Sequence, residues 1–152
     1  MVENGKILTD ECTQQVRTMG YMFGLLYYHF AKTLVEELGE EEGKRLILNA
    51  IRSYGHERGF KIKEEVQKRG LELTVENFKK FSDLPPLGWD SEAGKLVYCS
   101  YAQPWLEKGA EDLGNLYCEV DIALYEAYNP TIKVERLRSV LKGQECCEYN
   151  IE

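Results

Sequence analysis

Apolar residues recur at steps of three and four between residues 19 and 38, which is the spacing of side chains on one face of a helix. We predict a long amphipathic helix over this segment that ends at Gly39, since glycine commonly follows a helix C-terminus. The apolar face consists of Met19, Met22, Phe23, Leu26, Tyr27, Phe30, Leu34, Val35 and Leu38. Because tyrosines widen it on both flanks, we expect this face to contribute to a homodimer interface as well as to the core.

A second helix is predicted to begin with the acidic residues 40–42, since negative charge is favourable in the first turn of a helix. Its apolar face consists of Leu46, Ile47, Ala50, Ile51 and Tyr54. We expect Gly55 and Gly59 to break this helix, because glycine is unfavourable in a helix interior. The first two helices should then form a hairpin.

The following segment is more polar and its periodicity is less regular. We predict a short helix over residues 62–67, stopped by Gly70, and another over residues 75–81 with Thr74 as its N-cap. Residues 83–90 contain two prolines and a glycine, so they should form a loop.

The pattern changes in the second half of the chain. Residues 95–101 are rich in β-branched and aromatic types and predict a strand. Helices are predicted over residues 103–114 and 116–128, followed by two strands within residues 131–151 around a turn at residues 142–144. The expected fold is α+β, with an N-terminal helical hairpin and further helices packed on a small antiparallel sheet.

Length and charge narrow the possible functions. The 152 residues suit a single α+β domain over residues 1–152, and a net charge of −7 argues against a nucleic-acid-binding protein. No apolar run is long enough to cross a membrane, and the N-terminal segment does not resemble an export signal. We therefore expect a cytoplasmic protein whose partner is a small molecule, with no membrane partner and no cofactor.

Five cysteines at irregular spacing suggest free thiols in a protein without an export signal. There is no Cys-x-x-Cys pair and no closely spaced pair of histidines, so no local zinc motif is present. Any metal site would have to be assembled from distant segments.

The predicted helix over residues 116–128 carries the strongest candidates for chemistry. Cys118, Asp121, Ile122 and Tyr125 lie at steps of three and four, so they share one face. Asp121 could serve a facing cysteine as an acid, a base or an orienting group. Alternatively, Cys118 is a small core residue and Asp121 a cap or an ion-pair partner.

Two more cysteines could join this face. Alternation along the last strand places Cys147, Tyr149 and Ile151 on one side, and Cys99 lies in the first predicted strand. If the two strands are neighbours, Cys99, Cys118 and Cys147 converge. They would then form a thiolate site, a zinc site completed by a carboxylate such as Glu119 or Glu148, or a group of buried thiols without a task.

Three further side chains are candidates for the same site. His29 lies at the border of the first apolar face and either points into a pocket or stays at the edge of the core. Arg136 and Arg138 share one face of a predicted strand, where they either bind a carboxylate or pair with glutamates across the hairpin.

Several short pieces of the chain together resemble one family, the L-2-amino-thiazoline-4-carboxylic acid hydrolases. In chain order they are the strand cysteine Cys99, Leu113-Gly114, Cys118-x-x-Asp121, Asn129-Pro130 and Gly143-x-x-x-Cys147. The similarity covers most of the chain. It implies hydrolysis of a small cyclic amidine, acting on non-peptide C–N bonds and opening a thiazoline ring to N-carbamoyl-L-cysteine.

The resemblance also suggests roles for individual residues. Cys118 would be the nucleophile, near the N-terminus of its helix, where the helix dipole favours a thiolate. Asp121 would transfer protons, and His29 would share that task. The residues expected to bind the substrate are Cys99, Tyr125, Asn129, Arg136 and Arg138.

The closing helix and hairpin are also similar to small-molecule-binding domains of the 4-vinyl-reductase type. That similarity implies a ligand-sensing domain, often dimeric and sometimes holding zinc, for which the ligands here would be Cys99, Cys118 and Cys147. The sequence departs from the zinc pattern, because Ser139 stands where a cysteine ligand would be expected. We therefore expect no bound metal.

Overall fold

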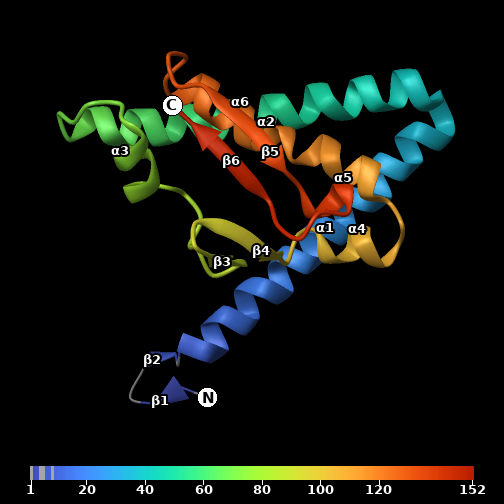
Figure 1. The fold of residues 1–152 in the computed structure, drawn as a ribbon, viewed down its shortest axis with the longest axis horizontal. Helices are drawn as coiled ribbons and strands as arrows, with labels where there is room; N and C mark the ends of the chain where they lie inside the picture. The colour runs from blue at the N-terminus through green and yellow to red at the C-terminus, as the bar shows by residue number, and fades with distance from the viewer. Residues whose placement is uncertain (1, 4–5, 8) are drawn as a thin grey trace.

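The computed structural model describes residues 2–3, 6–7 and 9–152 (Figure 1). The short strands β1 (Val2–Glu3) and β2 (Lys6–Ile7) pair in antiparallel fashion ahead of two long helices. These helices are α1 (Thr9–Leu38) and α2 (Glu40–Lys68), and they form the predicted hairpin. The chain reverses at Gly39, which has a φ of 83°, a conformation that favours glycine.

The buried face of α1 differs from the predicted one. The fully buried positions of this helix are the small residues Gly20, Gly24 and Ala31. A Cβ at Gly24 would lie 2.2 Å from the Tyr101 carbonyl oxygen, so the absence of a side chain lets the segment after β4 (Lys95–Cys99) pack on the helix backbone. The large residues that the periodicity assigned to the core are instead exposed, namely Met19, Met22, Phe23, Leu26, Phe30 and Leu38. Within the described residues, no helix is sufficiently long and apolar to cross a membrane.

The homodimer stays a prediction, and the exposed apolar face of α1 is the surface that we expect to form its interface. The Leu26 side chain is 57% exposed, and burying such residues between two copies would remove apolar area from water. We expect the protein to sediment as a dimer at micromolar concentration and Leu26→Glu to shift it toward monomer. Leu137→Glu alters a leucine that is similarly exposed, at 50%, but lies on another element, and it should leave the dimer intact. A wild-type protein that is monomeric over this range would contradict the prediction.

Helix α2 is continuous, whereas the sequence predicted a break at Gly55 and Gly59 and a separate helix over residues 62–67. Both glycines are buried against α6 (Glu119–Tyr128). A Cβ at Gly59 would lie 2.3 Å from the Leu124 carbonyl oxygen, and one at Gly55 would lie 2.9 Å from the Val120 carbonyl oxygen. The glycines therefore let two helix backbones come into direct contact, and this packing outweighs their low helix propensity.

Gly59→Ala tests this contact. Because the added methyl group has no room beside Leu124, we expect the free energy of unfolding to fall by about 2 kcal/mol in urea titrations, despite the better helix propensity of alanine. Ser53→Ala, at an exposed position of the same helix, should change stability little. Equal or greater stability of Gly59→Ala would show that the two backbones are not in contact.

The second half of the chain is α+β, as predicted. It contains α3 (Val75–Lys80), β3 (Trp89–Glu92), β4 (Lys95–Cys99), α4 (Gln103–Glu107), α5 (Glu111–Tyr117), α6, β5 (Val134–Arg138), the 3-10 helix η1 (Val140–Lys142) and β6 (Glu148–Ile151). The predicted N-cap is confirmed, since the Thr74 side chain accepts a hydrogen bond from the Asn77 backbone N–H at 3.2 Å. The hairpins β3–β4 and β5–β6 are antiparallel, and a bridge between Leu96 and Cys147 connects them.

The predicted helices over residues 103–114 and 116–128 are divided differently in the structure. The first is interrupted at Gly109, where φ is 60°, so α5 begins at Glu111. Cys118 separates α5 from α6. The turn at residues 142–144 also differs, because η1 precedes Gly143 and shortens the first strand.

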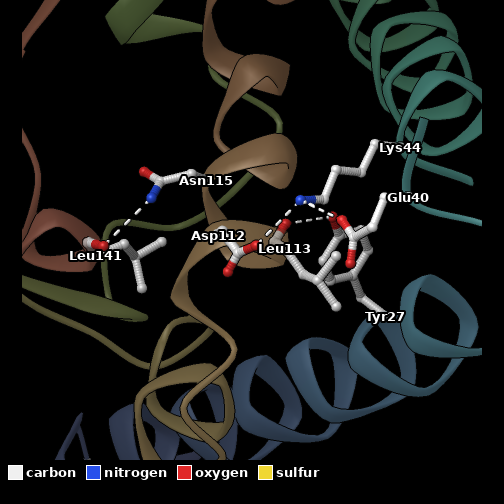
Figure 2. Close-up of polar contacts among 7 residues, drawn as sticks. All are labelled: Tyr27, Glu40, Lys44, Asp112, Leu113, Asn115 and Leu141. Atoms are coloured by element: carbon white, nitrogen blue, oxygen red, sulfur yellow. Dashed lines mark hydrogen bonds and ion pairs between the residues drawn. The ribbon is translucent and has the colours of Figure 1, made fainter. Parts of the chain in front are cut away.

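Helix α5 is fixed from both sides by polar contacts (Figure 2). The Tyr27 hydroxyl of α1 donates to the Leu113 carbonyl at 2.6 Å, and the Asn115 amide donates to the Leu141 carbonyl of η1 at 3.2 Å. The Lys44 ammonium lies between a carboxylate of α2, at 2.6 Å, and one of α5, at 3.1 Å. These contacts position the end of α5, and hence the residue that follows it, Cys118.

Candidate functional site

A cavity of about 520 Å³ lies between α6, the two hairpins and the loop after α3. Its walls are largely apolar and aromatic, and they include both tryptophans of the chain, Trp89 and Trp105. The charged groups that reach it come from α2, from α3 and the loop after it, and from α6, and the Tyr149 hydroxyl of β6 joins them. A largely apolar cavity with a few polar groups is typical of a small-molecule site.

Cys118 lies in the cavity wall at the N-cap of α6, close to the predicted helix N-terminus. Burial raises the pKa of its thiol, and the nearby Asp121 carboxylate raises it further. The Arg136 guanidinium opposes both effects. At neutral pH the cysteine is therefore a thiol, and a nucleophilic role requires a base beside it.

Asp121 follows on the same helix and also lines the cavity. Desolvation raises the pKa of its carboxyl group, although the Tyr149 hydroxyl donates a hydrogen bond to Oδ2 at 2.8 Å and favours the ionised form. The positive charges of Arg58 and Arg136 also favour ionisation. A carboxyl group with a raised pKa is a stronger base than an exposed aspartate when ionised, and it can return a proton near neutral pH.

The pKa shift of Asp121 predicts a pH-dependent stability. As pH rises above ~4, the unfolded chain loses this proton before the folded protein does, so ionisation favours unfolding. The stability contributed at low pH by the neutral carboxyl is therefore lost as pH rises. Asp121→Asn cannot ionise, and we expect the variant to gain stability relative to wild type as pH rises above about 4 in urea titrations. A stability difference between the variant and wild type that does not change with pH would contradict the raised pKa of Asp121.

The three cysteines Cys99, Cys118 and Cys147 all line the cavity, as the sequence predicted if the strands are neighbours. Backbone hydrogen bonds between Leu96 and Cys147, at 3.0 and 2.8 Å, make β4 and the start of the last strand neighbours. Burial raises the pKa of Cys99 to about 11, so this residue is a protonated thiol. The Cys147 sulfur accepts a hydrogen bond from the Val140 backbone N–H at 3.4 Å.

The zinc alternative does not fit this arrangement. Among the residues whose side chains the structure describes, no three histidine, cysteine or acidic side chains are placed to hold one metal ion. Ser139, at the position where a cysteine would be expected, is buried and its hydroxyl accepts from the Leu141 backbone N–H at 3.2 Å. This serine is the N-cap of η1.

Comparison with known proteins agrees with the resemblance. The family model for L-2-amino-thiazoline-4-carboxylic acid hydrolase matches residues 19–151. The chain belongs to this family. Searches of curated proteins and of solved structures return no match. Every residue that lines the cavity falls within the range matched to the hydrolase family.

In this member of the hydrolase family, three of the expected site residues lie away from the cavity. His29 is exposed on α1 and contacts the Tyr28 ring, because its helix face turns outward. The Asn129 amide donates to the Leu73 carbonyl at 2.8 Å and so stabilises the loop after α6. Arg138 is exposed at the edge of β5 and pairs with Glu148 at 3.4 Å. The structure therefore does not bring these three residues together with Cys118 and Asp121 at the cavity.

The other expected site residues lie at the cavity or behind its wall. Cys99 and Tyr125 line it, and the Tyr125 ring stacks on Phe78 with a centroid distance of 4.0 Å. The Arg136 side chain is only 11% exposed and lies 3.6 Å from Glu119. Its Nη1 is buried without a hydrogen-bond partner among the described atoms, and its charge acts on Cys118 from behind the wall.

Three residues of the candidate site were missed in the sequence. Tyr149 was placed on the correct strand face but given no role, although its hydroxyl binds Asp121. Arg58 and Asp83 form an ion pair at the cavity across 25 residues of sequence. No local motif marks such a pair, and the expected break of α2 at Gly55 concealed the position of Arg58.

Proposed function

We propose that the protein hydrolyses a small cyclic amidine of the L-2-amino-thiazoline-4-carboxylate type and releases N-carbamoyl-L-cysteine. The observation that carries the proposal is the placement of Cys118 and Asp121 in the wall of one cavity, within the range matched to the hydrolase family. The cavity volume of about 520 Å³ is ample for a single thiazoline ring with its carboxylate.

The electrophile of such a substrate is the ring carbon bonded to sulfur and to two nitrogens. Overall, water supplies an oxygen to this carbon and the carbon–nitrogen double bond of the amidine becomes single. The bond that breaks is the ring carbon–sulfur bond, not the carbon–nitrogen bond expected from the resemblance. The sulfur takes up one proton of the water as the thiol of the product, and the former double-bonded nitrogen takes up the other. Both nitrogens stay on the carbonyl carbon, which gives the carbamoyl group.

In the proposed mechanism, Asp121 accepts the proton of Cys118 as the sulfur attacks the ring carbon. The ring carbon–sulfur bond then breaks, and Asp121 returns the proton to the departing sulfur. The enzyme is left as an isothiourea on Cys118. Water adds to the isothiourea carbon with Asp121 as base. The Cys118 sulfur departs and takes the proton back from Asp121, while the hydroxyl proton moves to the double-bonded nitrogen as the carbonyl forms.

Three neighbouring groups support these steps. The field of Arg136 stabilises the Cys118 thiolate, which offsets part of the desolvation that raises its pKa. The hydrogen bond from the Tyr149 hydroxyl orients the Asp121 carboxylate. The apolar walls exclude bulk water from the reacting atoms, which strengthens both electrostatic effects.

The test is incubation of the purified protein with L-2-amino-thiazoline-4-carboxylate. We expect one free thiol to form for each ring consumed and N-carbamoyl-L-cysteine to appear in the mass spectrum. Absence of both from a folded preparation would contradict the proposed substrate.

A second candidate is a ligand-binding domain without catalysis, as in the 4-vinyl-reductase-type domains. The raised pKa of Cys118 and the apolar walls favour it, because neither feature activates a nucleophile. Tight binding of the thiazoline without formation of product would support this candidate over the hydrolase.

A further inference from the structure

Arg58 is a largely buried cation in the cavity wall. Its side chain is 12% exposed and extends from α2 between Gly55 and Gly59, the two glycines that contact α6. Nε and Nη2 donate to Oδ2 and Oδ1 of Asp83, each at 2.7 Å. Such a paired arrangement fixes the plane of the guanidinium.

Asp83 engages only one edge of this guanidinium. Nη1 donates to no group in the described part of the chain. It is not one of the buried polar atoms that lack a hydrogen-bond partner, so it remains accessible. The Tyr54 ring lies 5.2 Å from the guanidinium carbon and supports one side of it. The edge formed by Nη1 and Nη2 is therefore fixed in position and free to donate hydrogen bonds to a second carboxylate.

The charges around the cavity favour a cation at this point. Among the described residues that line the cavity, Arg58 and Lys79 are the basic ones, and Lys79 is exposed on α3. A ligand with a carboxylate would enter the cavity beside Asp121, and the protein as a whole has a net charge of −7. The ligand carboxylate therefore requires a positively charged partner in the cavity. Arg58 and Asp121 both line the cavity, and the positive charge of Arg58 acts to lower the pKa of Asp121.

We infer that Arg58 binds the carboxylate of the substrate through its Nη1–Nη2 edge, while Asp83 is a positioning residue that holds the guanidinium on its other edge. The inference rests on the proposed function for the nature of the substrate. It assigns the carboxylate to Arg58 rather than to Arg136, which was expected from the sequence, because Arg136 lies behind the wall and does not line the cavity.

The experiment measures binding without turnover. Calorimetry in a Cys118→Ala background would compare L-2-amino-thiazoline-4-carboxylate with its carboxamide and with 2-aminothiazoline, which lacks the group. We expect the carboxylate to bind ~10- to 100-fold more tightly than the carboxamide, as for a buried charge-assisted pair. In Arg58→Gln this preference should fall to about onefold, and Asp83→Asn should reduce it part of the way.

A preference ratio measured within one variant is insensitive to the fraction of protein that is folded. Arg52→Gln is the matched control, since Arg52 lies on the same helix, pairs with Glu126 at 2.5 Å and does not line the cavity. It should retain the full preference for the carboxylate.

Three results would overturn the inference. Loss of the preference in Arg136→Gln but not in Arg58→Gln would assign the carboxylate to the other arginine. Equal binding of carboxylate and carboxamide by the Cys118→Ala protein would show that Arg58 does not bind the carboxylate, whereas the proposed thiazoline substrate would be unaffected. If none of the three compounds binds, the substrate class fails, and the assignment of Arg58 fails with it.

Discussion

Cys118→Ser should retain the fold and lose nearly all turnover of the thiazoline carboxylate, with a fall in kcat on the order of a thousandfold or more. Serine is close to cysteine in volume, so the cavity wall should remain intact. Its hydroxyl is a much weaker acid than a thiol, and Asp121 cannot deprotonate it to a useful extent. The measurement is kcat and KM by thiol release, with circular dichroism to verify folding.

Cys146→Ser is the control for this variant. Cys146 is buried, but it does not line the cavity, so its loss should leave turnover close to wild type. Mass spectrometry of rapidly quenched wild-type protein should also show the isothiourea on Cys118. Wild-type turnover by Cys118→Ser would exclude the nucleophile and leave direct attack by water, with Asp121 as base, as the remaining mechanism.

Asp121→Asn is expected to bind the substrate and to turn it over ~10²- to 10⁴-fold more slowly. The amide retains the shape of the carboxylate and can still contact the Tyr149 hydroxyl, but it cannot accept or return the proton of Cys118. The effect should therefore appear in kcat and much less in KM. Any residual activity should require higher pH, where hydroxide replaces the missing base.

Glu126→Gln provides the comparison for Asp121→Asn on the same helix. Glu126 is exposed, pairs with Arg52 and does not line the cavity, so its substitution should leave kcat unchanged. An Asp121→Asn variant with wild-type kcat would show that the proton transfers involve another group.

Features encoded by local sequence were predicted correctly. Gly39 ends α1, Thr74 caps α3, and the change from helical to strand periodicity after residue 90 gives the α+β class. Alternation along the last strand correctly placed Cys147 and Tyr149 on the face that reaches the cavity. These features depend on neighbouring residues alone, which is why pattern and propensity could reveal them.

Features that depend on a distant partner were not predictable in this way. Gly24 and Gly59 are buried because another backbone packs directly on them, and the sequence of one helix does not show that partner. The same limit applies to the site. Cys118 and Asp121 share a helix face and were predicted, whereas the pair of Arg58 and Asp83 forms only once α2 and the loop after α3 are brought together.

The placement of both tryptophans in the cavity wall has a practical consequence. Trp105 is 1% exposed, and its indole N–H donates to the Gly24 carbonyl at 2.8 Å, whereas Trp89 is half-buried at the end of β3. Indole emission depends on local polarity and on nearby quenching groups, and this chain has no other tryptophan to contribute background. Its tryptophan fluorescence therefore originates at the cavity wall, and the unlabelled protein can report whether a compound occupies the cavity.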